Sequence, residues 1–529
     1  MAREFELKMI GPPAALERLR RAQWLKSLTA GRANTAAMQT TYFDTSDFSL
    51  AEQGVSLRIR KQGRRLTQTV KSLNGKTAPR WDRAEQDAAV SAVAPEPALI
   101  EDGYIRKKLT HWTEAGELKP VFETDVRRTA IPLMSEEGLK VEAAFDYGSI
   151  RALGAKEGVS QPVAELELEL KEGDSAALFA LARLVARETP LRFSLESKAD
   201  RGYALAQGAT DKPVRAKPLT LNGDMRTSDA FALIMHEGLK QMIANENAIL
   251  RGRDVEGIHQ MRVAIRRLRS AIAAFGNAYD HSEIARLKGE MKWIASVLGC
   301  ARDWDVFQNR TFAPVFAAFP KDSGLFAMAA AIRRVRRDAW AQAVAQLESE
   351  RYRLFVIDIA AAISGHVWVD QTQSQTALAE DKTCPYERPL SKTAQKCLDK
   401  RLAKVEELGL RMADLAIEER HELRIRLKRL RYSADFLASC YARKSTKRYL
   451  ASLSDLQDVF GELNDDAVAV QLVGKLLQTT EDTNDEPPEA DLQRAGGLVI
   501  GWHMASGERL WEQAQRRWRR FADAEPFWR

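Results

Sequence analysis

Cysteine is scarce in this chain, and long hydrophobic runs are missing. Four of the 529 residues are cysteine, and none stands in a CxxC motif or a Cys-His cluster. This usage is typical of a reducing cytoplasm, which is the predicted location, and it excludes an obvious zinc site. No run of eighteen apolar residues occurs and the first residues are charged, so neither a membrane span nor a secretory signal is expected.

The chain also lacks a glycine-rich phosphate loop of the GxxxxGK[ST] type, which excludes a P-loop enzyme. At 529 residues it is too long for one hydrophobic core, and about two to four domains are expected. Its 80 Lys and Arg against 73 Asp and Glu give a net charge of +7. This charge permits an anionic partner without choosing among nucleic acid, membrane and polyphosphate.

The first 205 residues follow mainly a period-two pattern of apolar and polar residues, which predicts strands. Helical patterns interrupt it near 13–28 and 174–187. Eight or so antiparallel strands with few helices favour a sandwich or a barrel. The strands are expected at 2–10, 38–44, 54–62, 65–72, 80–90, 120–130, 139–147 and 162–171.

Charged residues in these strands are sorted by sign. Alternate side chains of a strand share a face, so Glu4, Glu6 and Lys8 point the same way. A solvated sheet face usually mixes signs along each strand. Sorting by strand instead suits a closed tunnel that holds a metal on one wall and an anion on the other. The acidic positions are Glu4, Glu6, Glu165, Glu167 and Glu169, and the basic ones are Arg58, Arg60 and Lys71.

A set of short segments in this region is informative through its order. The segments are Glu4-Phe5-Glu6-Leu7-Lys8, Tyr42-Phe43-Asp44-Thr45, Leu57-Arg58-Ile59-Arg60, Lys71, Glu123 to Arg127, Phe145-Asp146, Ala164-Glu165-Leu166-Glu167 and Ser197-Lys198-Ala199-Asp200-Arg201-Gly202-Tyr203. Taken together they resemble the CYTH family, the triphosphate tunnel metalloenzymes, whose signature is ExExK. The resemblance implies an eight-stranded antiparallel tunnel that binds triphosphate in its lumen with Mg²⁺ or Mn²⁺.

The resemblance also implies roles for the residues at matching positions. Glu6 or a neighbouring carboxylate is expected to accept the proton of the attacking water. Arg127 and Arg128 are neighbours on a strand and point to opposite faces, so only one of them is expected to contact the triphosphate, and Arg127 is the one predicted. Metal ligands are expected at Glu4, Glu6, Asp146, Glu165 and Glu167. Triphosphate contacts are expected at Lys8, Arg58, Arg60, Lys71, Arg127 and Lys198, and the expected catalytic set is Glu6, Lys8, Arg58, Arg60, Lys71 and Lys198.

The expected chemistry fits these residue types. A triphosphate carries about four to five negative charges near neutral pH, which lysine and arginine must largely neutralise. The resemblance to the CYTH family implies a metal-dependent inorganic triphosphatase that hydrolyses tripolyphosphate to pyrophosphate and phosphate. A class IV-like adenylate cyclase or a thiamine triphosphatase would use the same tunnel. A non-enzymatic polyphosphate-binding protein is the alternative from another class.

Past residue 205 the pattern changes. Residues 206–224 lose periodicity and collect Pro, Gly and Lys, which predicts a linker. From 225 to 525 the period is 3.6, which predicts an all-α domain. The fold class is therefore α+β multidomain: an N-terminal eight-stranded antiparallel β tunnel or barrel with helices over residues 1–205, followed by an all-α domain of two repeated helical bundles.

The helical part repeats itself with one offset. His259, Arg262, Arg266 and Arg269 return as His421, Arg424, Lys428 and Arg431, and Gly299, Asp303 and Val306 return as Gly461, Asp465 and Val468. Both sets shift by 162 positions, since 421 − 259 and 461 − 299 give the same number. A constant offset indicates two copies of one unit, at approximately 225–363 and 394–525.

Each copy carries a uniformly positive helix face, because these positions fall at i, i+3, i+7 and i+10. A solvated face normally mixes Glu and Lys, so two such faces together predict a cationic channel for a long polyanion. Residues 225–520 resemble the CHAD domain, which implies polyphosphate binding through His259, Arg262, Arg266, Arg269, His421, Arg424, Lys428 and Arg431. The expected partners are tripolyphosphate and long-chain polyphosphate, rather than a membrane or nucleic acid.

Overall fold

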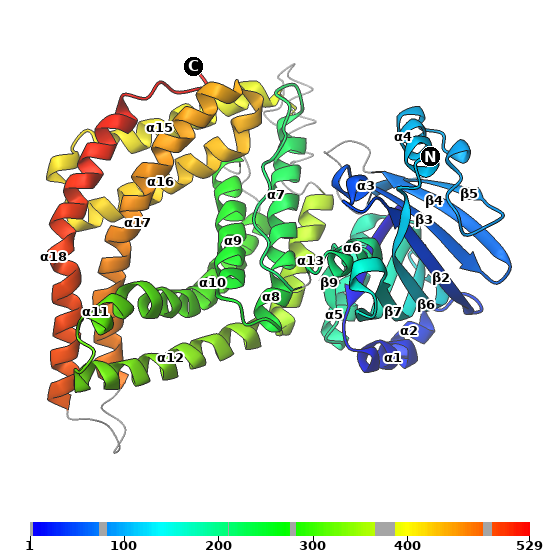
Figure 1. Ribbon diagram of the computed structural model, residues 1–529, viewed down its shortest axis with the longest axis horizontal. Helices are drawn as coiled ribbons and strands as arrows, with labels where there is room; N and C mark the ends of the chain where they lie inside the picture. Colours follow the sequence, from blue (N-terminus) through cyan, green and yellow to red (C-terminus); the bar gives the residue numbers. More distant parts are fainter. Residues whose placement is uncertain (1–3, 73–81, 210, 276–281, 366–386, 480–488) are drawn as a thin grey trace. The chain divides into compact units, whose positions relative to one another are not determined.

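The computed structural model describes residues 4–72, 82–209, 211–275, 282–365, 387–479 and 489–529 (Figure 1). The chain forms two compact units. The first comprises Met1–Lys212 together with Glu348–Gly365, and the second comprises Pro213–Leu347 together with His366–Arg529. The boundary between residues 212 and 213 falls within the predicted linker. None of the described helices is both long and apolar enough to cross a membrane.

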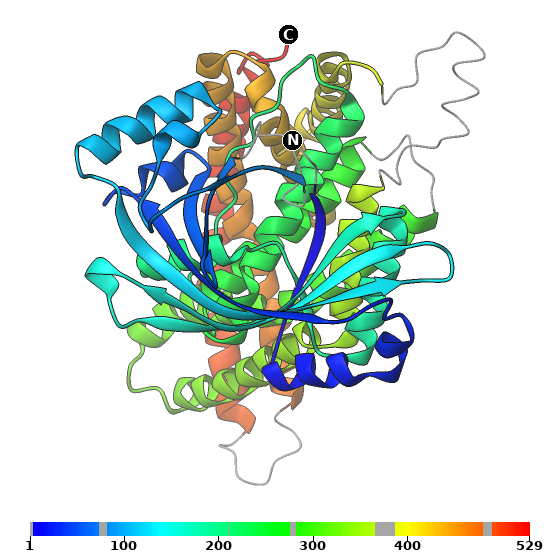
Figure 2. The same ribbon diagram turned by 90° about the vertical axis from the view of Figure 1, so that its right-hand side faces the viewer.

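The first unit is built on one antiparallel sheet whose ends meet. Its strand order is β5-β4-β3-β2-β6-β7-β8-β1-β9, and a further pairing of β5 with β1 joins the ends of the eight-strand series. The strands curve strongly, as Figure 2 shows. They are β1 (Glu4–Ile10), β2 (Asn34–Asp44), β3 (Val55–Gln62), β4 (Arg65–Ser72), β5 (Asp82–Ala89), β6 (Lys119–Met134), β7 (Lys140–Ala152), β8 (Ser160–Glu172) and β9 (Arg192–Ser194).

The predicted fold class is confirmed: an antiparallel β unit precedes an all-helical one. All eight predicted strands occur, and β9 is added as a three-residue strand that pairs with β1. The helices of the first unit are α1 (Pro13–Arg21), α2 (Gln23–Ser27), α3 (Ser49–Glu52), η1 (Pro97–Leu99), α4 (Gly103–Glu114), η2 (Gly154–Lys156), α5 (Ser175–Glu188), α6 (Lys198–Ala206) and α13 (Glu350–Ser364).

Helices cover the outer face of the sheet where its strands turn apolar residues outward. Leu7 and Met9 of β1 are fully buried, and α5 packs against β1 and β8. On the other side, Leu109 of α4 joins Leu57 and Ile59 of β3 in one apolar cluster. The opposite, inward side of the strands is left for polar residues.

Helix α13 completes the first unit although it lies far along the chain. It packs on α5 and on β9. Arg183 of α5 donates from Nε to Asp358 Oδ1 at 2.6 Å, and Arg353 Nε donates to the carbonyl of Ala186 at 3.1 Å. The first helical copy is predicted to run to residue 363, but these contacts place residues 348–365 with the first unit. Apolar periodicity predicts the helix and does not tell which unit buries its apolar face.

The second unit is all-helical, and its repeat is visible in the helix bounds. Helices α9 and α16 are both 21 residues long and start 162 positions apart, since 417 − 255 is 162. Its elements are α7 (Thr227–Ala244), α8 (Glu246–Leu250), α9 (Val255–Phe275), α10 (Ser282–Val306), η4 (Phe307–Phe312), α11 (Ala313–Ala318), α12 (Ser323–Leu347), α15 (Leu390–Gly409), η5 (Met412–Asp414), α16 (Ile417–Leu437), η6 (Ala438–Cys440), α17 (Arg443–Thr479) and α18 (Glu489–Ala522).

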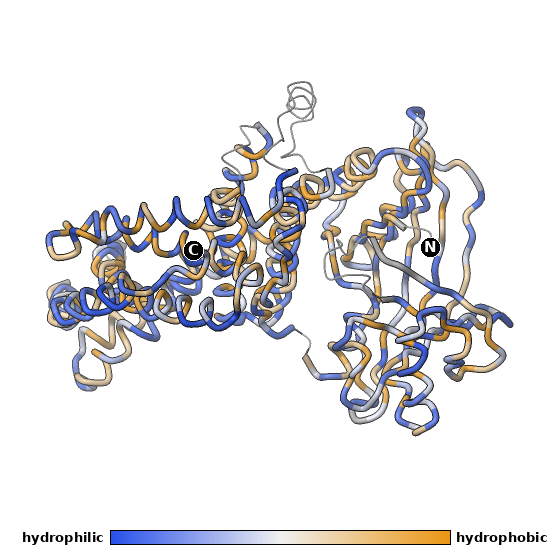
Figure 3. The backbone as a smooth tube through the Cα atoms, turned by 90° about the horizontal axis from the view of Figure 1, so that it is seen from above, coloured by the Kyte–Doolittle hydropathy of each residue, from blue (hydrophilic) through white to orange (hydrophobic). Residues whose placement is uncertain are grey.

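These helices are amphipathic, and hydrophilic and hydrophobic stretches alternate along each of them in Figure 3. The apolar positions predicted for the repeat are buried: Met261, Ile265 and Leu268 of α9 are 0% exposed, as are their counterparts on α16. Helices α9 and α16 contact each other, and each also contacts the helix that follows it in its own copy, α10 or α17. The two copies therefore meet at the helices that carry the repeated basic residues.

Candidate functional site

The carboxylates of the first unit gather on one wall, because the strand register places them opposite one another. Glu6 pairs with Glu169 across β1 and β8, and Lys8 pairs with Glu167. Asp146 of β7 pairs with Glu165 of β8. Directly paired residues in an antiparallel sheet project to the same face, so β1, β7 and β8 together build an acidic inner wall.

The basic residues line the facing strands. Arg58 and Arg60 of β3 pair with Tyr42 and Thr40 of β2, and Ser56 of β3 pairs with Lys71 of β4. Both walls border one cavity of about 270 Å³. The predicted residues that line it are Glu6, Lys8, Arg58, Arg60, Lys71, Glu167 and Lys198. The structure thus brings Glu6 and Glu167 into one space with all of the predicted triphosphate contacts except Arg127.

Three carboxylates form the innermost part of the acidic wall. Asp146 and Glu165 are 0% exposed and Glu167 is 7% exposed. One oxygen from each lies within 4.8 Å of the others. Buried carboxylate oxygens at such spacing are the hard donors that Mg²⁺ and Mn²⁺ prefer, so these residues fit a divalent cation. The predicted ligand Glu4 belongs to β1, and its side chain lies outside the described part of the chain.

Cationic side chains neutralise this cluster in the structure. Lys198 Nζ lies 2.6 Å from Asp146 Oδ2 and 3.0 Å from Glu167 Oε1, and it also contacts Glu165. Arg128 donates to both oxygens of Asp146, at 2.8 and 2.7 Å, and also contacts Glu167. These contacts put Lys198, which is predicted to hold triphosphate, at the border between the acidic wall and the cavity.

Burial and charge act in opposite directions on these groups. Burial alone would lower the pKa of Lys8, but the carboxylates of Glu167 and Glu6 outweigh it and raise that pKa. Burial would likewise raise the pKa of Glu167, yet Lys198, Lys8 and Arg128 hold it well below its usual range. The pKa of Lys198 is raised, because the carboxylates around its ammonium outweigh the effect of burial. Lys8, Glu167 and Lys198 therefore stay charged at neutral pH.

Helix α6 positions Lys198 at its first turn. Ser197 caps the helix: its Oγ accepts from the backbone N–H of Asp200 at 3.1 Å, and the Asp200 carboxylate accepts from Ser197 N at 2.9 Å. Gly202 lets α6 approach β6, because a Cβ at this position would lie 2.1 Å from the Phe122 ring. The Ser197–Tyr203 segment, which resembles the family motif, thus caps α6 and allows it to pack closely against the sheet.

The Tyr42–Thr45 motif has a comparable structural basis. Asp44 is fully buried, and its carboxylate accepts from the backbone N–H groups of Thr45, Leu50 and Ala51 at 2.7, 2.9 and 3.0 Å. It therefore ties the end of β2 to α3. Tyr42, two residues earlier, stacks on Phe122 and lines the cavity.

The prediction that Arg127, rather than Arg128, faces the triphosphate selects the wrong side of strand β6. Arg127 is exposed on the outer face of β6, whereas Arg128 lines the cavity with Thr124 and Val126. The β6–β7 hairpin fixes this register, because it pairs Arg128 with Asp146 and continues to Met134 and Lys140 at its turn. A turn centred near residue 137, with Asp146 already selected, would have identified Arg128 from the sequence.

Two further contacts support the walls of the cavity. Arg201, which belongs to the Ser197–Tyr203 segment, contacts Glu165 from α6, and Thr69 Oγ1 donates to Asp87 Oδ1 at 2.6 Å. Asp87 lines the cavity and comes from β5. An acidic residue among the basic strands was not expected, and only the pairing of β4 with β5 brings it there.

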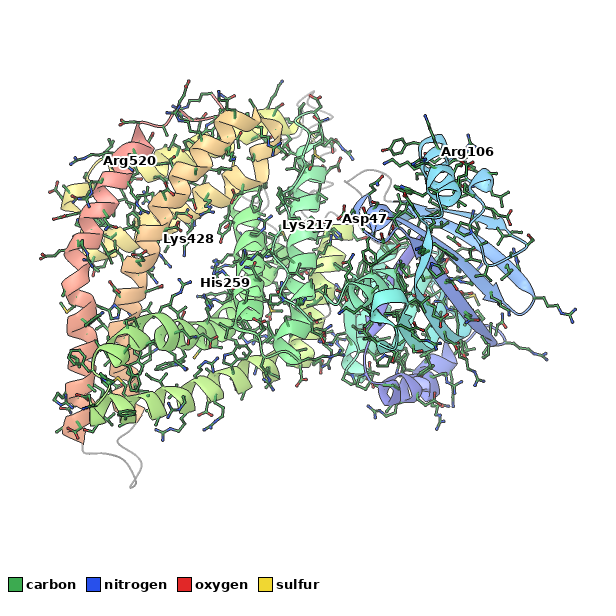
Figure 4. All side chains as sticks on the ribbon, in the orientation of Figure 1. Asp47, Arg106, Lys217, His259, Lys428 and Arg520 are labelled. Carbon is green, nitrogen blue, oxygen red and sulfur yellow. The ribbon has the colours of Figure 1, made fainter. Side chains whose placement is uncertain are left out.

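The second unit gathers the repeated basic residues at the contact of α9 and α16, where Figure 4 labels His259 and Lys428. Arg266 Nε donates to the hydroxyl of Tyr432 on α16 at 3.1 Å, which links the two copies directly. The positive fields of Arg266 and Arg424 act on Lys428, and those of Arg302 and Arg266 act on His259. Five predicted residues are thereby brought together: His259, Arg262, Arg266, Arg424 and Lys428.

Burial and mutual repulsion lower the pKa values in this cluster. Burial, with Arg302 next, lowers the pKa of His259 to about 4, and burial lowers the pKa of Arg262 to about 10 against the favourable charge of Asp303. Burial together with Arg424 and Arg266 lowers the pKa of Lys428 to about 7. The charged forms of these groups are stabilised when an anion approaches, because the anion offsets their mutual repulsion.

The remaining predicted members of the basic set lie elsewhere. Arg269 and His421 are exposed on their helices. Arg431 donates to Ser454 Oγ at 2.9 Å and lies 3.7 Å from Asp435. The sequence did not indicate Arg302 of α10, whose charge acts on His259, or Lys475 of α17 and Arg310 of η4, whose charges act on Asp303 and Asp465. Those residues have no counterpart in the i, i+3, i+7 pattern of α9 and α16.

Comparison with known proteins supports both resemblances. The CYTH domain family matches residues 2–203, and the CHAD domain family matches residues 233–474. A protein of Haemophilus influenzae named inorganic triphosphatase is 36% identical over 208 residues, which are 39% of this chain and 55% of that protein. This chain therefore matches about half the length of that relative.

A second relative aligns with both parts of the chain. It is an uncharacterized protein of Mycobacterium tuberculosis, 25% identical over 439 residues, or 80% of each protein. Among solved structures, the crystal structure of the CHAD domain from the plant Ricinus communis covers 58% of this chain and 96% of its own, at 26% identity and a TM-score of 0.48.

Proposed function

The chain carries a CYTH domain followed by a CHAD domain, and we propose that it is a metal-dependent inorganic triphosphatase with an attached polyphosphate-binding helical domain. One observation carries the enzymatic part of this proposal: Glu167 of the buried carboxylate cluster lines the same cavity as Glu6 and the basic wall. The name of the Haemophilus influenzae relative points to the same activity.

The basic wall suits the oxygens of a triphosphate. Arg58 and Arg60 stand at alternate positions of β3, and Lys71 adds a third charge from β4. Guanidinium groups bind phosphate oxygens with two parallel hydrogen bonds, and the ammonium groups of Lys71 and Lys8 act as compact point charges. Together these groups neutralise most of the ligand charge and orient the chain of phosphates.

Asp146, Glu165 and Glu167, with Glu6 beside them, would hold the cation. Bound Mg²⁺ or Mn²⁺ would supply positive charge to phosphate oxygens and lower the pKa of a bound water. The residues of the chain position the reacting groups, so the stabilisation is mainly electrostatic. Lys198 contacts all three carboxylates and borders the cavity, so its ammonium is within reach of both the cluster and the substrate.

Glu6 is the proposed acceptor of the water proton. Its carboxylate lies 3.2 Å from Lys8 Nζ and its side chain is 33% exposed, so it opens to the cavity. The three inner carboxylates are instead held by Lys198, Arg128 and Arg201. A base must reach the attacking water, which favours the accessible carboxylate.

The decisive experiment compares phosphate release from tripolyphosphate, ATP and thiamine triphosphate with Mg²⁺ and with Mn²⁺. Tripolyphosphate is expected to be hydrolysed fastest, and Glu6→Gln is expected to abolish turnover while the melting temperature stays unchanged. Faster cyclisation of ATP than hydrolysis of tripolyphosphate would replace the proposal with the adenylate cyclase alternative. Preference for thiamine triphosphate would change the substrate but keep the site.

The second part of the proposal is polyphosphate binding by the α9–α16 cluster. It is supported by the concentration of cations that both copies contribute and by their low pKa values. Charge reversal at Arg266 and Arg424 should weaken binding of long-chain polyphosphate at least tenfold, with tripolyphosphate turnover retained. Reversal of the exposed Arg333 on α12 is the control. Equal loss in the control would point to general attraction by net charge, and unchanged affinity in both would leave a triphosphatase without this binding site.

A further inference from the structure

The two helical copies differ at one position of the basic cluster. Arg266 of the first copy corresponds to Lys428 of the second, because 428 − 266 equals the repeat offset of 162. The position four residues earlier is arginine in both copies, at Arg262 and Arg424. A guanidinium keeps its charge at any pH a protein encounters, whereas an ammonium can lose its proton when its surroundings disfavour charge. The substitution therefore places one titratable cation among fixed ones.

The surroundings of Lys428 disfavour charge. Arg424 precedes it by one turn of α16, Arg266 and Arg262 face it from α9, and Asp465 of α17 supplies the opposing charge. Tyr432, one turn after Lys428, accepts the hydrogen bond of Arg266, so this face of α16 is turned toward α9. Within the described ranges, Lys428 has no carboxylate at ion-pair distance. Three arginines thus act on a half-buried ammonium against one aspartate.

Near neutral pH this ammonium is close to half protonated, since its pKa lies at about 7. A polyanion lying across α9 and α16 would screen the three arginines and pair with the ammonium. Both effects raise the pKa of Lys428 toward its ordinary range. A group whose pKa rises on binding takes up a proton when the complex forms.

We propose that Lys428 makes polyanion binding by the helical unit proton-linked, so that a bound anionic chain draws a proton onto this residue. The inference rests on the proposed polyphosphate binding and concerns its regulation. Affinity is greatest below the pKa of the free protein and falls as the pH rises through that value. If the bound pKa reaches 9 or more, affinity decreases about tenfold between pH 6 and pH 8.

One other base in the cluster must be separated from Lys428. His259 faces Arg302, Glu256, Arg266 and Arg262, and its pKa of about 4 leaves it neutral in the free protein at pH 6 to 8. A bound anion also raises this pKa, which would add proton uptake mainly at the acid end of the range. The variant His259→Gln removes that contribution and keeps Lys428.

The test is isothermal titration calorimetry of the full-length protein with long-chain polyphosphate. Titrations at pH 7 in buffers of different ionisation enthalpy give the number of protons taken up on binding. Long chains keep the end phosphates, which titrate near pH 6, scarce relative to the bound phosphates. Roughly half a proton per bound site is expected for the natural protein and for His259→Gln.

The matched variant is Lys428→Arg, which reproduces in the second copy the residue of the first. Combined with His259→Gln, it should bind as tightly at pH 8 as at pH 6 and take up no proton at pH 7. Arg266→Lys is the reciprocal control and should add pH dependence rather than remove it. Proton uptake that persists unchanged in Lys428→Arg overturns the inference while leaving polyphosphate binding in place. Absence of binding by the natural protein overturns the proposed binding function itself.

Discussion

Two neighbouring arginines illustrate how much a single strand register decides. Arg128 contacts Asp146 and Glu167 inside the first unit, and Arg127 is exposed on the outside. Their side chains have the same composition and almost the same place in the sequence. Comparing substitutions of these two residues therefore distinguishes a specific role of Arg128 in the cavity from a general effect of positive charge.

We predict that Arg128→Ala lowers kcat/KM for tripolyphosphate by at least about 100-fold, a magnitude typical of losing a preorganised electrostatic group. Removal of Arg128 also leaves two buried carboxylates with less positive charge, so the melting temperature should fall. Arg127→Ala should change neither quantity appreciably. Steady-state kinetics and thermal unfolding check both variants, and a comparable loss of activity in Arg127→Ala would contradict the assignment.

A second residue pair tests the helical cluster. Gly299 of α10 leaves room for Arg262, because a Cβ there would lie 2.5 Å from Arg262 Nη1, whereas Gly461 of the other copy faces open space. Gly299→Ala should therefore move Arg262, whose Nη1 donates to the carbonyl of Ala295 at 2.7 Å. We expect a several-fold loss of polyphosphate affinity with little loss of stability, because the guanidinium is flexible.

Gly461→Ala serves as the matched control and should leave affinity unchanged. Titration of a labelled polyphosphate against both variants measures the difference. Equal affinities in the two variants would show that the placement of Arg262 against α10 is not needed for binding.

Among whole elements, α6 depends on one close approach. Gly202 seats the helix on Phe122, and a methyl group at this position would overlap the ring. Gly202→Ala should cost about 1–3 kcal/mol of stability, the usual range for overpacking a filled core. It should also reduce tripolyphosphate turnover, because Lys198 begins the same helix. Chemical denaturation and phosphate release measure the two effects, and the open glycine Gly289 on α10 is the control site.

The elements predicted correctly are those that follow from local periodicity. The eight strands, the charge sorting along them and the 162-residue repeat can all be read from patterns shorter than one element or from direct self-comparison. Helices α4 and α6 were not predicted, since they are short and lie among loop residues. Strand β9 has three residues, which is too few to show a period.

The site residues that were predicted correctly also follow from local periodicity. Glu6, Lys8, Arg58 and Arg60 were found because they alternate within single strands. Arg128 and Asp87 were missed because their position depends on which strand lies next to them. Contacts between distant elements are set by packing and turn geometry, and composition along one strand does not reveal them.

On the scale of the molecule, the first unit is assembled from two distant stretches of chain. Residues 348–365 belong to it although Pro213–Leu347 of the other unit lies between the two stretches. Tyr352, Phe355 and Ile359 of α13 are 0–1% exposed, so this helix is part of a core and not a surface addition. The first unit is therefore larger than the region that matches the CYTH domain.

We predict that Asp358→Ala lowers the free energy of unfolding of the first unit by about 1–3 kcal/mol, because the carboxylate accepts a charged hydrogen bond from Arg183 and is 10% exposed. Asp338→Ala on α12, an exposed carboxylate, is the control. Differential scanning calorimetry resolves the transitions. If the unfolding transition of the first unit is unchanged in Asp358→Ala, the ion pair between Asp358 and Arg183 adds no stability.

Helix α13 also has a consequence for biosynthesis. When the ribosome has released residue 212, every strand of the sheet is available, but the helix that covers α5 has not yet been made. About 150 further residues must be translated to complete α13, which at roughly 5–20 residues per second takes on the order of ten to thirty seconds. During that interval the face of α5 that α13 will cover is exposed to solvent. The first unit can therefore be completed only after Pro213–Leu347 of the second unit has also been synthesised.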